Sequence, residues 1–459
     1  MEKCVKFLPD KQIYQKIFGG FKLKAYLCST RIRHASHRTA YQGGTFCLYA
    51  YGSNWCSDYP LFNNFHSWYG ISEESGGTRL ELNANNVTGN LYLNELEYNA
   101  LFLHDNNINS ITIDNCLSRW GRQSSNNGWK YTSRFTLDQN KVPVSINMKK
   151  SYLAGGIFIS ARNTSCKDIN INDCWFNSSS SKEKREYDNH GLQIYTQSIN
   201  NLNIENCQYL SDIQGNRMGN YYAMPMGPQD YFPSEDDLKR VEVNNMTIVN
   251  TTFTSFHPHI SGLLDAYDPI IRGFNIKSLT LKGINETLTF EDTKIGYLKF
   301  FVPQGELMND LYHSKVFIHI KNNAEVDTLH ITGESAEHNI FLYFGNELKL
   351  KKLIFENVFE GDIWPSSSNE PLYIESISFI NIKRLRKYIT GNRNIRNVKD
   401  IYIKQCEIDS LPETEGNATY HITNSVYSTK INGKWCDVSI TNFVGTREQF
   451  IQTYGNSRY

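Results

Sequence analysis

The sequence predicts an all-β protein built as a stack of similar coils, a β-solenoid. The first observation is a six-residue pattern, here called the hexad: apolar, any, apolar, any, Asn-like, apolar-or-Cys. The second is its spacing, since four consecutive copies begin 24 residues apart, at Leu329, Leu353, Ile377 and Ile401. The third is that Asn, Asp or Gly occupies position five of most copies. A fixed repeat of this length is typical of solenoids, in which each coil buries its core only against its neighbours.

Each hexad predicts a short strand followed by a corner. Alternating apolar residues at positions one and three bury one face of a strand. An Asn-like residue at position five tolerates left-handed backbone, and such side chains should hydrogen-bond from coil to coil. Position six turns inward again, and in four copies it is Cys, a small side chain that suits a narrow core. The copies begin at Leu91, Ile111, Ile169, Leu202, Met246, Leu279, Leu329, Leu353, Ile377, Ile401 and Val438.

The hexad with its Asn-like corner resembles the repeat of right-handed parallel β-helix proteins, the pectin-lyase-like group. The resemblance covers roughly residues 79–443 and implies a right-handed parallel β-helix, but it specifies no activity. The chain departs from the group's enzymes, because it lacks the paired-Asp motif of polygalacturonases and the calcium-binding Asp cluster of pectate lyases. A β-sandwich or propeller is the alternative fold, and it leaves the three equal spacings unexplained.

Both ends of the solenoid should be capped, because an open coil exposes strand edges and core. Residues 1–78 lack the hexad and are expected to form the N-terminal cap region, including a helix over residues 11–18. At the other end, Thr446-Arg-Glu-Gln449 predicts a capping box that begins a short helix. Residues 444–459 are therefore expected to form a C-terminal cap.

The earlier copies are unevenly spaced, which predicts long loop insertions at 117–143, 175–191, 208–240 and 252–276. Insertions at one phase of a solenoid emerge on one face, so these should form a rim along the N-terminal half. Loops on a rigid scaffold commonly carry binding and chemistry. The functional surface is therefore expected on this rim.

The insertions are rich in aromatic and charged residues, which predicts a carbohydrate-binding groove. The expected substrate-binding residues are Trp120, Arg122, Trp129, Trp175, Tyr221, Tyr222 and Tyr267. Glycoside hydrolysis would need two carboxylates, and a polysaccharide lyase would need a base and a cation. The candidate catalytic residues are Asp188, His190, Asp212, Arg217, Asp265 and Asp268. Each of these also fits a turn or a solvated loop.

The expected function is carbohydrate binding or polysaccharide degradation, as a lyase, a glycoside hydrolase or a tailspike-like depolymerase, and the sequence leaves open whether the chain is an enzyme. The alternative is a non-enzymatic, protein-binding scaffold. We expect neither a metal nor another cofactor, since no Cys or His spacing fits a zinc site. Basic and acidic residues balance at 47 each, which argues against a nucleic-acid or membrane partner.

Two features of the N-terminal region bear on location and partners. No apolar run fits a signal peptide, so we expect a cytoplasmic protein or a component of a phage particle. In such a compartment most of the ten Cys should be buried thiols. The basic run at 31–38 either binds phosphate or is a solvated loop or partner contact.

Overall fold

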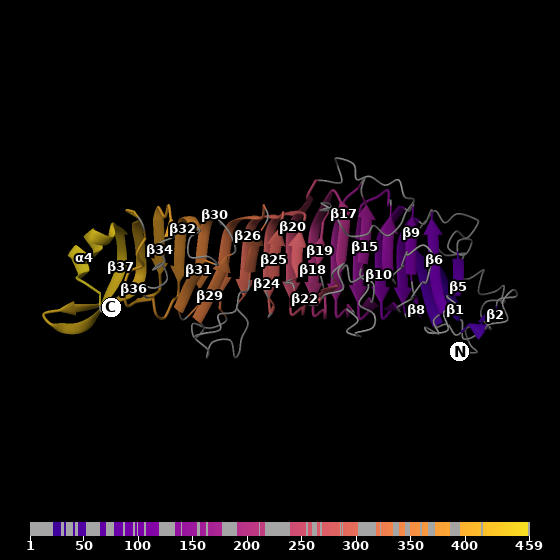
Figure 1. The fold of residues 1–459 in the computed structure, drawn as a ribbon, viewed down its shortest axis with the longest axis horizontal. Helices are drawn as coiled ribbons and strands as arrows, with labels where there is room; N and C mark the ends of the chain where they lie inside the picture. The colour runs from indigo at the N-terminus through magenta and orange to yellow at the C-terminus, as the bar shows by residue number, and fades with distance from the viewer. Residues whose placement is uncertain are drawn as a thin grey trace. The chain divides into compact units, whose positions relative to one another are not determined.

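The computed structural model of the chain is all-β, with parallel strands that follow one another coil by coil (Figure 1). It has the right-handed parallel β-helix fold that the sequence predicts. The chain divides into two compact units, which we call unit 1 (Met1–Thr247 and Thr251–Phe274) and unit 2 (Ile248–Asn250 and Asn275–Tyr459). The structure describes residues 22–28, 32–33, 40–41, 45–51, 65–69, 78–85, 88–94, 97–98, 100–104, 107–118, 134–138, 140–153, 157–161, 164–176, 191–210, 212–215, 239–253, 256–258, 264–266, 269–284, 286, 288–301, 318–321, 323–333, 339–344, 349–358, 360–365, 372–385, 395–414 and 416–457.

Unit 1 carries the N-terminal hexad strands in one parallel sheet. The register places Leu91 opposite Ile111, Ile111 opposite Ile146, Ile146 opposite Ile169, and Ile169 opposite Leu202. All five side chains are at most 1% exposed, so position one forms a continuous core column. The strands are β7 (Thr88–Asn94), β10 (Asn107–Asp114), β13 (Val144–Lys149), β16 (Cys166–Asn172), β18 (Ser198–Glu205) and β20 (Val241–Val249).

Two further sheets complete the coils of unit 1. The longer one contains β5 (Phe65–Tyr69), β6 (Thr78–Asn85), β9 (Ala100–His104), β12 (Arg134–Asp138), β15 (Ile157–Ala161), β17 (Leu192–Thr196), β19 (Ile213–Gln214) and β23 (Ile270–Arg272). The shorter one contains β8 (Glu97–Tyr98), β11 (Leu117–Ser118) and β14 (Tyr152–Leu153). Three strands per coil is the number that a coil of about 24 residues accommodates at ordinary strand rise.

The expected N-terminal cap region contributes antiparallel strands. β1 (Lys22–Cys28) pairs with β4 (Thr45–Tyr51), and β4 pairs antiparallel with β7. A second antiparallel pair is formed by β2 (Ile32–Arg33) and β3 (Ala40–Tyr41). Antiparallel pairing satisfies the backbone groups of β7 that would otherwise form an open edge. The predicted helix over 11–18 lies outside the described residues.

Unit 2 repeats the arrangement with closer spacing. Its hexad strands are β24 (Phe274–Lys282), β26 (Lys294–Phe301), β28 (Glu325–Thr332), β30 (Lys349–Glu356), β32 (Leu372–Ile380), β34 (Asp400–Lys404) and β36 (Thr419–Ile431). The position-one column runs through Leu279, Leu298, Leu329, Leu353, Ile377, Ile401 and Tyr420. All seven are at most 2% exposed. The remaining strands are β25 (Leu288–Glu291), β27 (Ile318–Lys321), β29 (Asn339–Phe344), β31 (Glu360–Pro365), β33 (Ile395–Arg396) and β35 (Glu407–Ile408).

The C-terminal end of unit 2 is closed by a hairpin and a helix. β36 turns back into β37 (Lys434–Gly445), an antiparallel pair. Helix α4 (Arg447–Tyr454) begins with the predicted capping box, in which Thr446 and Gln449 bond each other's backbone amides. Phe450 of α4 is fully buried, with its ring 4.9 Å from that of Tyr427. The predicted C-terminal helix is therefore confirmed.

The hexad beginning at Val438 was wrongly predicted as another parallel coil. It lies in β37, where Asn442 is opposite Thr423 in the antiparallel pair. The alternation of a return strand matches the first part of the hexad, so the pattern alone does not separate the two.

Three coils were not recognised from the sequence, because each of their hexads departs from the pattern. The copy at Ile146 has Lys150 at the corner, the copy at Leu298 has an apolar fifth residue, and the copy at Tyr420 begins with an aromatic residue. The neighbouring strands nevertheless hold all three in register.

The position-five corners adopt the left-handed backbone that the Asn-like residues predict. Positive φ angles of 46° to 65° occur at Asn115, Asp173, Asn206, Asn250, Gly283, Asn357, Asn381 and Gln405. The expected bond between stacked corners is present where Asn381 Nδ2 donates to Asn357 Oδ1 at 2.8 Å. A second ladder, on the outer face of unit 1, links position two of three coils: Asn203 donates to Asn170, and Asn170 to Asn147, both at 2.8 Å.

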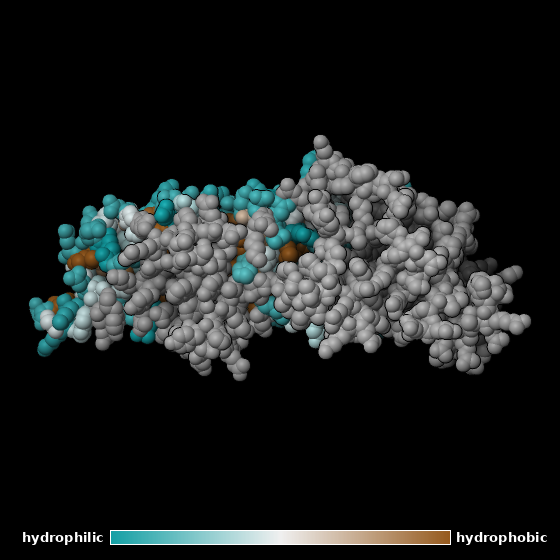
Figure 2. Space-filling view, viewed as in Figure 1, coloured by the Kyte–Doolittle hydropathy of each residue, from teal (hydrophilic) through white to brown (hydrophobic). Residues whose placement is uncertain are grey.

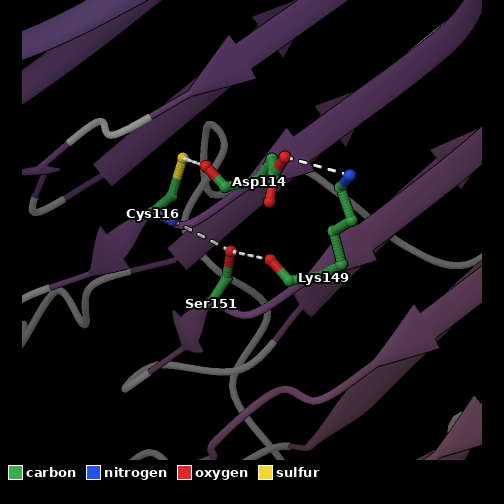
Figure 3. A network of polar contacts seen from close by, with 4 residues as sticks. All are labelled: Asp114, Cys116, Lys149 and Ser151. Atoms are coloured by element: carbon green, nitrogen blue, oxygen red, sulfur yellow. Dashed lines mark hydrogen bonds and ion pairs between the residues drawn. The ribbon is translucent and has the colours of Figure 1, made fainter.

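In several coils position six supplies a hydrogen-bonding side chain inside the turn, and Figure 3 shows one such network. The amide of Cys116 donates to Ser151 Oγ in the next coil at 3.1 Å, and Ser151 Oγ donates to the carbonyl of Lys149 at 2.8 Å. Cys116 Sγ is 3.4 Å from the carbonyl of Asp114. Each side chain therefore satisfies backbone groups that the left-handed corner leaves out of the strand ladder.

The thiols at and near these turns are buried. Cys116, Cys166, Cys174, Cys207 and Cys406 are free and at most 3% exposed, as the sequence predicts. Burial raises the pKa of Cys166 and Cys406 to about 12. A thiol with a raised pKa is a poor nucleophile, because only the thiolate reacts readily. We therefore assign these two residues to packing and to hydrogen bonding with the backbone.

Candidate functional site

Most of the predicted site residues lie outside the described part of the chain. These are Trp120, Arg122, Trp129, Asp188, His190, Arg217, Tyr221, Tyr222, Tyr267 and Asp268. Asp265 is described only through its backbone in β22 (Leu264–Ala266), which pairs with β21 (Phe256–Pro258). Trp175 and Asp212 are described with their side chains, so the site is built from them.

The predicted insertions also contain regular structure. The range 117–143 includes β11 and β12, 208–240 includes β19, and 252–276 includes the hairpin of β21 and β22 together with β23. These strands continue the coils, so the inserted chain in each range is shorter than the spacing of the hexads indicates. The rest of each range lies outside the described residues.

Trp175 belongs to a ladder formed by the residues that follow position six in unit 1. Parallel bridges pair Trp175 with Tyr152 in one neighbouring coil and with Gln208 in the other. The amide of Trp175 donates to the carbonyl of Ser151 at 2.9 Å, and the amide of Gln208 donates to that of Cys174 at 3.0 Å. These bonds fix the backbone, so this ladder is a rigid base for the side chains that project from it.

Two exposed aromatic rings meet on this ladder, and we call Trp175 and Tyr209 the aromatic platform. Trp175 is 45% exposed and Tyr209 is 46% exposed. Their ring centroids are 5.5 Å apart with the planes inclined by 33°. The described atoms on the face drawn in Figure 2 are mainly hydrophilic, with only small separate apolar patches. Two paired and half-exposed aromatic rings are therefore a distinctive surface feature of the described chain.

Tyr209 is placed on the platform by one extra residue. One exposed residue, Trp175, separates the buried Cys174 from the buried Phe176. In the next coil two residues, Gln208 and Tyr209, separate Cys207 from Leu210. An extra residue in one strand is a bulge, which redirects a side chain.

The bulge holds Tyr209 in a left-handed conformation with φ of 59°. The other non-glycine residues with positive φ in the described chain are Asn, Asp, Lys or Gln, so Tyr209 is the only aromatic one. The amide of Tyr209 donates to Thr252 Oγ1 at 3.1 Å, which fixes this conformation. Left-handed backbone at a bulky residue is unfavourable and occurs where the surrounding structure enforces it, often at binding sites.

Asp212 stands in a different environment. It is 6% exposed, and its Oδ1 accepts the amide of Ile270 at 3.0 Å. Its Oδ2 accepts from Gln214 Nε2 at 3.3 Å. The carboxylate of Asp212, the residue before β19, is thus bonded to the first residue of β23. The predicted catalytic role of Asp212 stays a prediction.

The platform was partly predicted from the sequence. Trp175 was expected to contact substrate, and the structure places it on the surface beside a second ring. Tyr209 was not among the predicted binding residues, because the hexad pattern ends at Cys207 and does not describe the residues after it. The available signal was the count of residues between the inward Cys and the next apolar residue, which is one after Cys174 and two after Cys207.

Two further features limit the chemistry of the described residues. No group of three or more His, Cys, Asp or Glu side chains among them is arranged to hold a metal ion. No helix within the described ranges has the length and apolar character to cross a membrane.

Comparison with known proteins finds no protein-family model, no curated protein and no solved structure that significantly matches this chain.

Proposed function

We propose that the chain binds a glycan through the aromatic platform of unit 1. The observation that carries the proposal is the left-handed Tyr209, whose ring is brought against Trp175 at the surface. Ordinary packing gives no reason for an aromatic residue there, since the corner positions of the same fold use Asn and Asp. Aromatic faces stack on the apolar faces of sugar rings, which makes a rigid pair of rings a suitable glycan contact.

The exposed area of the platform is sufficient for a measurable affinity. A large aromatic side chain buries about 150–250 Å² when it is fully covered. An exposed fraction of 45% for Trp175 therefore leaves roughly 90 Å² for a ligand. At about 25 cal/mol per Å², covering that area contributes up to ~2 kcal/mol, so we expect each ring to change Kd by roughly 5- to 30-fold.

A more specific proposal is that the chain also cleaves the glycan that it binds. A lyase or a glycoside hydrolase would draw its catalytic groups from the predicted candidates in the insertions, because these supply carboxylates, a histidine and an arginine. Asp212, which accepts hydrogen bonds from Ile270 and Gln214, is the one catalytic candidate whose side chain the structure describes. Binding is the part of the proposal that the described residues support.

A panel of neutral and acidic polysaccharides tests the proposal. Wild-type protein should be retained by at least one immobilised polysaccharide, and the Trp175→Ala and Tyr209→Ala variants should be retained less. Trp435→Ala is the matched control, because Trp435 is 46% exposed and lies in β37 of unit 2. Equal retention of all four proteins, or retention of none by any polysaccharide, would reject the proposal.

A further inference from the structure

Unit 2 contains a connected row of titratable side chains on the outer face of three successive strands. The register of β26, β28 and β30 places Lys299 opposite His330, and Thr332 opposite Glu356. Because side chains alternate along a strand, these residues and Tyr297 project from the same face, opposite to the core column. The row was not apparent from the hexads, because it occupies positions that the pattern leaves free.

The row is joined by two close contacts through the imidazole of His330. Tyr297 Oη lies 2.5 Å from His330 Nδ1, and Glu356 Oε2 lies 2.9 Å from His330 Nε2. The second contact lies off the direction of a ring N–H hydrogen bond, so it is mainly an electrostatic pairing. Glu356 nevertheless favours the tautomer with hydrogen on Nε2, which leaves Nδ1 to accept the phenolic proton.

The surroundings favour the neutral forms of His330 and Tyr297. His330 is 7% exposed, and burial together with the charge of Lys299 lowers the pKa of its imidazole. Glu356 opposes this shift and Lys352 adds to it. Burial and the charge of Glu356 raise the pKa of the Tyr297 phenol. At neutral pH the pair is therefore a protonated phenol beside an imidazole that is free to take its proton.

Two cations flank the row without a carboxylate partner among the described residues. The ammonium of Lys299 lies over the ring of Phe301 at 4.9 Å, and that of Lys352 lies over the ring of Tyr402 at 5.8 Å. Aromatic faces hold a cation weakly, so both charges remain available to an anion. In β32, which lies between β30 and β34, the small Ser376 is opposite Lys352 and the small Ser378 is opposite Tyr402.

We propose that Tyr297, His330 and Glu356 form a proton relay at a site for a carboxylate-bearing ligand, with Lys299 and Lys352 providing the positive charge. In the relay, Tyr297 Oη forms a bond to an electrophilic atom of the ligand, the bond from that atom to its leaving group breaks, the leaving group departs with the bonding electron pair, and the phenolic proton passes to His330 Nδ1. The resulting imidazolium is stabilised by Glu356, which acts as a positioning residue. This is the arrangement of a nucleophile, a base and an orienting carboxylate, with a phenol as the nucleophile.

An anionic, phenol-directed reagent tests the relay without knowledge of a substrate. With 4-(fluorosulfonyl)benzoate, the Tyr297 oxygen forms an S–O bond, the S–F bond breaks, fluoride leaves, and the phenolic proton passes to His330. Peptide mapping by mass spectrometry would give the labelling rate at each tyrosine. We expect Tyr297 to be labelled about tenfold or more faster than Tyr402, although Tyr402 is 40% exposed and Tyr297 is less exposed.

The pH profile separates a relay from a merely reactive environment. An ordinary phenol reacts as phenolate, so its labelling rate rises about tenfold per pH unit below the phenol's pKa. Labelling of Tyr297 should instead be nearly constant between about pH 7 and 8, because the lowered pKa of His330 favours its neutral form there. The titratable groups that face His330 from the neighbouring strands are Tyr297, Lys299, Lys352 and Glu356.

Matched variants assign the roles. His330→Gln should reduce the labelling rate of Tyr297 to that of Tyr402. Glu356→Gln should reduce it several-fold, and this variant keeps the test available if His330→Gln does not fold. Lys299→Gln should slow the carboxylate reagent but leave the neutral 4-(fluorosulfonyl)benzamide unaffected. The proposal is overturned if Tyr297 is labelled no faster than Tyr402, if its rate follows the same pH slope, or if Glu356→Gln and His330→Gln leave it unchanged.

Discussion

The backbone conformation of Tyr209 yields the sharpest prediction, because it separates stability from binding. We consider two substitutions that both remove the ring, Tyr209→Asn and Tyr209→Ala. Asn tolerates left-handed backbone through its short polar side chain, whereas Ala does not. The two variants therefore lose the same platform contact but differ in the cost of holding φ at 59°.

The size of the difference follows from the geometry of the bulge. Left-handed backbone costs an ordinary L-residue roughly 1–2 kcal/mol, and Asn avoids part of it. We expect Tyr209→Asn to be more stable than Tyr209→Ala by about 1 kcal/mol. Loss of the contact between Tyr209 and Trp175, about 0.5 kcal/mol at an exposed site, is common to both variants and cancels in the comparison.

Urea unfolding followed by circular dichroism measures the difference, and retention on the polysaccharide that binds best measures function. Both variants should bind with a Kd that is roughly 5- to 30-fold higher, because they lack the ring of Tyr209, of which 46% is exposed and available to a ligand. A Tyr209→Ala variant as stable as Tyr209→Asn would refute the left-handed conformation. Full binding by either variant would refute the role of the ring.

Three other predictions concern the scaffold. Ser151→Ala leaves the buried amide of Cys116 without its acceptor and should lower the free energy of unfolding by about 1–3 kcal/mol, whereas Ser151→Cys should cost less; equal losses in urea titrations would contradict the role of the hydrogen bond. Thr446→Ala removes the capping box of α4 and should lower the free energy of unfolding by about 1 kcal/mol in urea titrations. The control Thr453→Ala, at an exposed position of the same helix, should lower it less. Cys406, whose pKa burial raises to about 12, should resist iodoacetamide up to about pH 9 in the folded protein and react when urea is added; rapid labelling of native protein at pH 8 would disprove its burial.

The sequence was informative about the core because the core is periodic. Position one of the hexad forms the buried column in both units, and position five carries the left-handed corners. Alternation and corner chemistry are local properties, so they can be recognised from a few residues. The capping box at Thr446 is equally local, and it was predicted correctly for the same reason.

Errors arose where the tertiary partner decides the outcome. The hexad at Val438 has the right alternation but belongs to a strand that runs back along β36. The coil at Ile146 was missed because Lys150 occupies a corner whose conformation the neighbouring coils impose. Direction and register are set by contacts between strands, which a short pattern does not contain.

The functional surfaces were harder to predict than the core for a related reason. The ring of Tyr209 reaches Trp175 only through a bulge, and the residues are 34 positions apart. The relay of Tyr297, His330 and Glu356 unites three coils through outward positions that carry no pattern. Such clusters depend on register, so they become visible only once the coils are aligned.

The central claim is that a glycan contacts the aromatic platform, and ¹⁹F NMR of protein labelled with 5-fluorotryptophan tests it most directly. The chain has seven Trp, so the resonance of Trp175 can be assigned by comparison with a Trp175→Phe sample. On titration with an oligosaccharide of the retained polysaccharide, we expect a saturable shift of the Trp175 signal and no shift of the Trp435 signal. A Trp175 signal that stays unchanged while the oligosaccharide binds would show that the glycan does not contact the aromatic platform.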